Sequence, residues 1–139
     1  MHVVKGAAER VLGAKKTASI YVSGGHGRLT VQYERKPTEE EMKNIEKAAN
    51  EKIAEGAEVL EFEMERAEAE GHFGNGIYDL FPVPHGASRL HIVRIPDWNI
   101  NCCRERHVEN TLQIGKIKFG KARYRNSKRE LEIEFDLID

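Results

Sequence analysis

The chain has 139 residues, enough for one domain with a sizeable hydrophobic core. Its 22 basic and 23 acidic residues give a net charge of -1, which excludes a uniformly basic nucleic-acid binder, and a hydrophobic content of 40% excludes a disordered chain. No apolar run approaches the roughly 20 residues of a membrane span, and no signal peptide opens the sequence. We therefore expect a single domain over residues 1–139 in a soluble, cytoplasmic protein.

The pattern of apolar residues predicts an alternation of helices and strands. Helices are expected over residues 2–12, 37–56 and 65–72. Strands are expected over residues 17–21, 28–33, 58–64, 89–95, 112–119, 121–124 and 130–137, with an extended segment over residues 98–102. This order predicts an α+β fold with an antiparallel or mixed sheet and with helices packed on one face.

The second predicted helix has the clearest start and stop signals. Thr38 and Glu41 match a capping box, in which two residues exchange hydrogen bonds at the first turn. Gly56 is typical of a residue that ends a helix. The stripe expected to face the core consists of Met42, Ile45, Ala49 and Ile53.

Three glycines, Gly24, Gly25 and Gly27, lie between the first two predicted strands. Such glycines occur both in loops that bind phosphate and in hairpin turns. Because no helix follows them, we expect a hairpin turn.

Charge is distributed unevenly along the chain. Residues 34–70 hold 13 acidic and 6 basic residues, whereas residues 102–129 hold 9 basic and 2 acidic residues. The basic segment is either a solvated outer face or a surface that meets a phosphate backbone.

Cys103 and His107 form a Cys-x3-His pair. A tight turn or helix at this spacing brings a thiolate and an imidazole to one side, and both are good zinc ligands, although the same pair also occurs without metal. A zinc site needs further ligands, and His2 at the start of the first helix is placed to supply one. The other histidines, which we expect to be surface or packing residues, are His26, His72, His85 and His91.

Cys102 and Cys103 are adjacent, which argues against a disulfide framework and for a reducing compartment. If the segment is extended, neighbouring side chains point in opposite directions. We therefore expect Cys102 to be buried rather than to bind metal.

Three motifs follow one another along the chain: His2-Val3-Val4-Lys5-Gly6-Ala7, then Asp97-Trp98-Asn99, then Cys103-x3-His107. Together they resemble the alanyl-tRNA editing family, which comprises the editing domain of alanyl-tRNA synthetase and the free-standing AlaX proteins. The run YDLFPVP at residues 78–84 and the run DWNIN at residues 97–101 are similar to the short AlaX type. The resemblance covers essentially the whole chain.

The resemblance implies the fold of the threonyl- and alanyl-tRNA synthetase editing domains, and a zinc ion held by a His-x3-His pair and a Cys-x3-His pair. Carried over, His2 matches the second histidine of the first pair, and Cys103 and His107 match the later pair. The first histidine of the family's pair would precede Met1. We therefore expect a chain truncated at its N-terminus.

The implied function is trans-editing: the hydrolysis of tRNA(Ala) that carries serine or glycine, with the acceptor end of the tRNA as partner. Thr17 looks like the family's threonine that selects serine, although an ordinary strand threonine is an equal alternative. Asn101 is expected to face the same pocket. The basic residues expected to contact tRNA are Arg104, Arg106, Lys116, Lys118, Lys121 and Arg123.

Two other functions remain open at this point. Because one histidine of the family's set is missing, the chain could be a metal-poor, inactive module that binds tRNA or has a structural role. Alternatively, the same scaffold could edit another mischarged tRNA, as the related threonyl-tRNA synthetase domain does.

Overall fold

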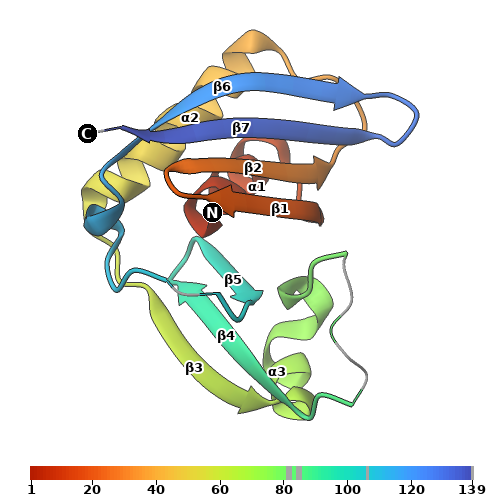
Figure 1. The fold of residues 1–139 in the computed structure, drawn as a ribbon. Coiled ribbons are helices and arrows are strands. Elements are labelled where there is room, and N and C mark those ends of the chain that lie inside the picture. Colours follow the sequence, from red (N-terminus) through yellow and green to blue (C-terminus); the bar gives the residue numbers. More distant parts are fainter. Residues whose placement is uncertain (81–82, 84–85, 106, 139) are drawn as a thin grey trace.

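The computed structural model describes residues 1–80, 83, 86–105 and 107–138. Three α-helices and two antiparallel sheets occur in this part of the chain (Figure 1), which confirms the α+β class. The helices are α1 (His2–Leu12), α2 (Glu39–Glu55) and α3 (Arg66–Phe73), with the short 3-10 helices η1 (Gly74–Ile77) and η2 (Thr111–Ile114). None of the described helices combines the length and the apolarity that crossing a bilayer demands.

The strands form a larger and a smaller sheet rather than one. The larger sheet has the order β1-β2-β7-β6, with β1 (Thr17–Ser23), β2 (His26–Gln32), β6 (Lys116–Arg125) and β7 (Glu130–Ile138). The smaller sheet has the order β3-β4-β5, with β3 (Leu60–Glu65), β4 (Arg89–Ile95) and β5 (Asn99–Cys102). Helices α1 and α2 cover one face of the larger sheet, and α3 lies beside the smaller sheet (Figure 1).

The main core is built from apolar side chains that alternate with polar ones along the central strands β2 and β7. Leu29 and Val31 of β2 are buried together with Leu131, Ile133 and Phe135 of β7, because side chains two residues apart point to the same face of a sheet. The helices supply the other side of this core. Of the stripe predicted on α2, Ile45, Ala49 and Ile53 are buried and Met42 is partly buried.

The predicted start and end signals of α2 are confirmed. The backbone N–H of Glu41 donates to the hydroxyl of Thr38 at 3.1 Å, and the backbone N–H of Thr38 donates to the Glu41 carboxylate at 2.9 Å. These bonds satisfy two donors that a helix start otherwise leaves unpaired. Gly56 ends the helix with φ 72°, a backbone conformation that favours glycine.

Helix α1 is buried on more than one side. A helix on the outside of a sheet buries one side, but every residue of α1 from His2 to Ala8 is buried, including Lys5. The reason is that α1 packs against α2 and β5, and its apolar residues share the main core with those of the larger sheet. The helix therefore lies between the two halves of the fold, where its polar side chains cannot reach open solvent.

The predicted C-terminal meander is wrong in one respect. Residues 112–119 and 121–124 were expected to be two strands, but η2 covers residues 111–114 and a single strand, β6, runs from Lys116 to Arg125. The pairing of β6 with β7 shifts register between Phe119 and Ala122, so Gly120 and Lys121 form a bulge rather than a break. Asn126 and Ser127 lie in the turn between β6 and β7.

Candidate metal centre and adjoining pocket

A row of polar side chains lies where α1 meets β5. His2 and Lys5 are three residues apart and so share one face of α1. Asn99 and Asn101 share one face of β5, on the side of α1. His2 Nδ1 lies 3.2 Å from Asn99 Oδ1, and the ammonium group of Lys5 donates to Asn101 Oδ1. The spacing of three residues on the helix and of two residues on the strand therefore brings two polar pairs together where α1 meets β5.

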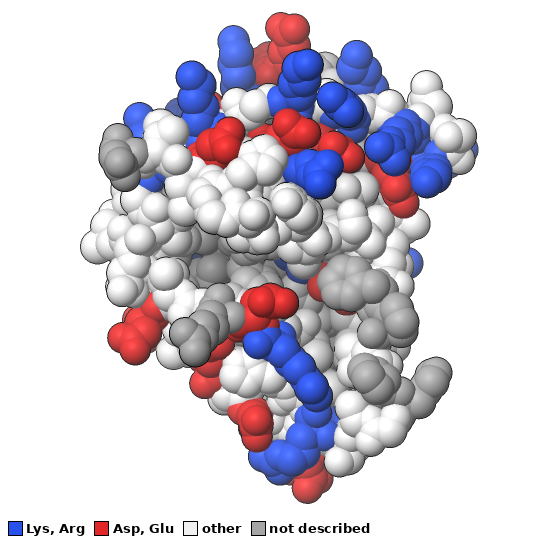
Figure 2. Space-filling view, viewed as in Figure 1, with Lys and Arg blue, Asp and Glu red and all other residues white. Residues whose placement is uncertain are grey.

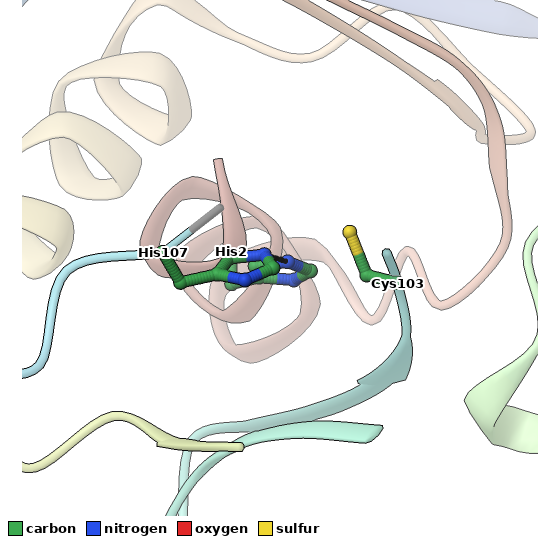
Figure 3. Close-up of side chains that lie close together, drawn as sticks. All are labelled: His2, Cys103 and His107. Atoms are coloured by element: carbon green, nitrogen blue, oxygen red, sulfur yellow. Dashed lines mark hydrogen bonds between the residues drawn. The ribbon is translucent and has the colours of Figure 1, made fainter. Parts of the chain in front are cut away.

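The predicted metal ligands meet at one end of this row. One ligand atom from each of His2, Cys103 and His107 lies within 4.8 Å of the others. The Nε2 atoms of the two histidines are 2.9 Å apart, and Cys103, which follows β5, lies beside the two rings (Figure 3). Cys102 packs against a second apolar cluster that contains Ile92, so it is partly buried where full burial was predicted.

Hydrogen bonds on the outer side of each imidazole fix which nitrogen faces inward. His107 Nδ1 lies 2.9 Å from Glu61 Oε1, and His2 Nδ1 faces the oxygen of Asn99. Carboxylate and amide oxygens only accept hydrogen bonds, so each imidazole donates from Nδ1, and in a neutral imidazole Nε2 then carries a lone pair. Two such lone pairs at 2.9 Å would repel each other, so either a shared proton or a metal cation is needed between the two Nε2 atoms.

The protonation states also suit a metal ion. Burial and the charge of Lys5 hold the pKa of His2 well below its usual range, so His2 is neutral at pH 7. Burial raises the pKa of the Cys103 thiol, and a bound cation would displace its proton. In a tetrahedral zinc site with bonds of about 2.0–2.1 Å, two nitrogen ligands are about 3.3 Å apart. The two histidines would therefore need to move apart by only a few tenths of an ångström to hold zinc, with Cys103 as a third donor within 4.8 Å.

Glu61 connects His107 to a further histidine. The same carboxylate oxygen accepts from His107 and, at 3.0 Å, from His91 Nε2. These two hydrogen bonds, first that of His91, lower the pKa of Glu61. A carboxylate behind a metal-binding histidine holds the ring in place and makes its free nitrogen more basic. The chain has this arrangement at His107, and the Cys-x3-His spacing gave no indication of it.

A cavity of about 310 Å³ adjoins the metal centre. Thr17 and Asn101, the two residues predicted to bind substrate, both line it and are both buried. Asn99 also lines it and bonds to His2, so this residue joins the pocket to the metal centre. The volume is near the lower end of ligand pockets, roughly 300–1,000 Å³.

Two further residues of the pocket were not identified from the sequence. Lys5 Nζ lies 2.9 Å from Asp79 Oδ1, and the two side chains are 6% and 8% exposed. Both line the cavity. A lysine among the apolar residues of α1 was a signal for a buried charge, because lysine is rarely buried without a partner. Asp79 follows η1 in an irregular segment, where no pattern distinguished it.

No family model matches the chain. Similar sequences occur in the alanine–tRNA ligases of three archaea: Saccharolobus islandicus at 39% identity, Sulfurisphaera tokodaii at 38% and Methanopyrus kandleri at 36%. Each alignment covers 84% of this chain. The chain is homologous to part of alanyl-tRNA synthetase. This relationship confirms the resemblance to the alanyl-tRNA editing family, and the chain spans about 13% of the length of these synthetases.

The basic residues predicted to contact tRNA do not form one patch in this synthetase-related chain. Arg104 is exposed close to Cys103. Four others, Lys116, Lys118, Lys121 and Arg123, are exposed on β6, the edge strand of the larger sheet. Acidic residues of β7 lie opposite them: Lys118 pairs with Asp136 and Arg123 with Glu132.

Figure 2 shows the result of this pairing, with basic and acidic side chains interleaved over β6 and β7. The positive charge of residues 102–129 is therefore partly neutralised across the sheet. Arg106, His85 and three residues of the run at positions 78–84 lie outside the described residues.

Proposed function

We propose that the chain hydrolyses the ester bond of a mischarged aminoacyl-tRNA, with zinc held by His2, Cys103 and His107. The observation that carries this proposal is the close approach of the two Nε2 atoms, with a thiol near them and with Asn99 joining His2 to the neighbouring polar pocket. Homology to alanyl-tRNA synthetase supports an aminoacyl-tRNA as the substrate.

Two side chains that are not ligands themselves hold the proposed histidine ligands in place. Glu61 bonds to His107 and Asn99 bonds to His2, and these bonds hold the orientation of both rings. Zinc, when bound, polarises a carbonyl or lowers the pKa of a water molecule. Asn99 bonds to His2 and also lines the pocket, which supports an ester bound between the two.

Serine is the amino acid that the pocket suits best. The Thr17 side chain lines the cavity, and its hydroxyl has no hydrogen-bond partner among the residues that the structure describes. A serine hydroxyl would satisfy it, whereas alanine would leave it unpaired. This contact gives no advantage to glycine, so we expect glycyl-tRNA(Ala) to be the poorer substrate.

The acceptor end of tRNA(Ala) is the proposed partner. Arg104 is close to the metal centre, and Lys116, Lys118, Lys121 and Arg123 offer exposed positive charges on β6 for phosphates further along the stem. Arg106 belongs to the same proposal from its place between Cys103 and His107. An aminoacyl-tRNA substrate would place the protein in the cytoplasm.

Deacylation by the zinc-loaded chain tests the function. We expect hydrolysis of seryl-tRNA(Ala), slower hydrolysis of glycyl-tRNA(Ala) and none of alanyl-tRNA(Ala), with activity lost in Cys103→Ala. A chain that binds zinc and hydrolyses none of these would contradict the proposal. A chain without zinc and without turnover would instead be the inactive module. Hydrolysis confined to seryl-tRNA(Thr) would indicate editing of another tRNA.

A further inference from the structure

The pocket beside the metal centre contains a carboxylate oxygen that nothing in the described structure uses. Asp79 Oδ1 accepts from Lys5 at 2.9 Å and lies 3.5 Å from the amide nitrogen of Asn101. Asp79 Oδ2 has no hydrogen-bond partner among the described residues, although the side chain is only 8% exposed. Because no buried polar atom of the described side chains lacks a partner, this oxygen is not fully enclosed, and Asp79 is one of the residues that line the cavity.

Lys5 and Asn101 hold this carboxylate in a fixed position. The Lys5 ammonium group donates both to Asp79 and to Asn101, and the Asn101 amide donates to the carbonyl of Ile77 at 2.7 Å. The three side chains come from different parts of the fold: Lys5 from α1, Asn101 from β5 and Asp79 from the segment after η1. An ion pair removed from water is costly unless it is well satisfied, and here one oxygen remains free.

The chemistry of the free oxygen defines what it would bind. A carboxylate oxygen accepts hydrogen bonds and favours a cationic donor. An aminoacyl ester carries such a donor, its α-ammonium group, on the carbon next to the ester carbonyl. The Thr17 hydroxyl in the same cavity is available to the side chain of that amino acid. The pocket therefore offers separate partners to the amine and to the side chain of one small residue.

We propose that Asp79 binds the α-ammonium group of the aminoacyl substrate and that Lys5 positions Asp79. The inference rests on the proposed function and names the contact by which the pocket distinguishes an aminoacyl ester from other esters. Asp79 acts in binding and orientation, and Lys5 acts through Asp79. The three metal ligands take no part in holding the amine.

Binding of two substrate analogues by the zinc-loaded full chain tests the inference. The probes are 3′-serylamino-3′-deoxyadenosine, an amide that replaces the labile ester, and its N-acetyl derivative, which has no charge on the amine. Isothermal titration calorimetry gives the affinity of each. We expect the free amine to bind roughly 10–100-fold more tightly, as is typical of one charge-assisted hydrogen bond, and Asp79→Asn to remove most of this preference.

The ratio of the two affinities is measured within each variant, so a general loss of binding does not change it. If Asp79→Asn does not fold, Asp79→Glu keeps the charge beside Lys5 and displaces the free oxygen, and the preference should again fall. A wild-type protein without preference for the free amine would overturn the inference. So would a variant that keeps the wild-type ratio, as expected if the metal centre holds the amine.

Hydrolysis of seryl-tRNA(Ala) by the wild-type chain separates this inference from the proposed function. Hydrolysis together with an affinity ratio that is independent of Asp79 means that the function stands and the inference fails. Absence of hydrolysis together with a ratio that depends on Asp79 means the reverse.

Discussion

The Nε2 atoms of His2 and His107 are 2.9 Å apart, although 105 residues separate the two histidines in the sequence. One stands at the start of α1 and the other follows β5, and each is oriented by an acceptor from a further element, Asn99 of β5 or Glu61 of β3. No single segment contains this arrangement. A metal ion held by both histidines would therefore be coupled to the docking of α1 against the smaller sheet.

Substitution of His107 by alanine should abolish zinc binding. It removes one of three donors, and two donors rarely hold zinc in a protein site. We expect about one zinc per wild-type chain and much less in His107→Ala, measured by elemental analysis after dialysis. His72→Ala is the matched control, because His72 is an exposed histidine of α3 away from the centre. Equal zinc in both variants would show that the metal binds elsewhere.

Replacement of Glu61 by glutamine should weaken zinc binding without abolishing it. The glutamine side chain could still accept a hydrogen bond from His107, but it would no longer increase the basicity of the ring with a negative charge. The expected loss of zinc affinity is about 10–100-fold, measured by competition with a chelator. Glu63→Gln is the control, since Glu63 lies on the same strand and pairs instead with Arg89 at 3.7 Å. A similar loss in both variants would indicate a general effect of surface charge.

The parts of the site that could be predicted are those with a fixed spacing. Cys103-x3-His107 and His2 stand out as motifs, and the structure brings all three together. Glu61, Lys5 and Asp79 could not be found in the same way, because each acts through a contact between elements that are far apart in sequence. Residues that support a site depend on tertiary packing and leave no periodic signal.

A similar division holds for the fold. The start of α2 was predictable because the bonds between Thr38 and Glu41 are made within one turn. The shape of β6 was not, because Gly120 suits both a break and a bulge, and only the pairing with β7 decides between them. Nor could the pattern on α1 show that both the larger sheet and β5 would bury it.

Neutralising Lys118 and Arg123 on β6 tests the proposed path of the tRNA. If each contacts a phosphate, each alanine variant should weaken binding and reduce the slope of log affinity against log salt by about 0.7–0.9. Filter binding of tRNA(Ala) over a range of salt concentrations measures both quantities. Lys47→Ala on α2 is the control, since that lysine is exposed and lies 3.9 Å from Glu51. An unchanged slope in the β6 variants would exclude this strand from the contact.

Gly6→Ala should destabilise the protein, although alanine usually favours a helix. A Cβ atom at position 6 would overlap the indole of Trp98, whose Nε1 donates to the carbonyl of Val3 at 2.9 Å. Either α1 or the turn that carries Trp98 must then move, at a cost of about 1–3 kcal/mol. Urea denaturation measures this loss. In Gly71→Ala on α3 a Cβ would meet nothing within 4 Å, so that control should be neutral or slightly stabilising. A stabilised Gly6→Ala would mean that the indole can shift freely.

Glu41 makes the stability of the protein depend on pH at the acid end. Arg35 donates to both carboxylate oxygens, at 2.7 Å and 2.9 Å, and the N–H of Thr38 donates to one of them. The Arg35 contact and the Thr38 hydrogen bond lower the pKa of Glu41 from 4.5 to about 2. Since the folded-state pKa is depressed, the stabilisation is fully present above pH 4.5 and is lost as the pH falls toward 2.

Glu41→Gln separates this charge effect from the capping bond, because glutamine can still accept from the Thr38 N–H. At neutral pH the variant should unfold at a lower urea concentration than the wild type, and the difference should stay constant down to about pH 4.5. Below that it should shrink, because the wild-type carboxyl takes up its proton as the protein approaches pH 2. Glu40→Gln, one residue earlier on α2, should show no such convergence, since no ion pair forms there within the described structure. A difference independent of pH would mean that the effect of Glu41 comes from packing and not from its charge.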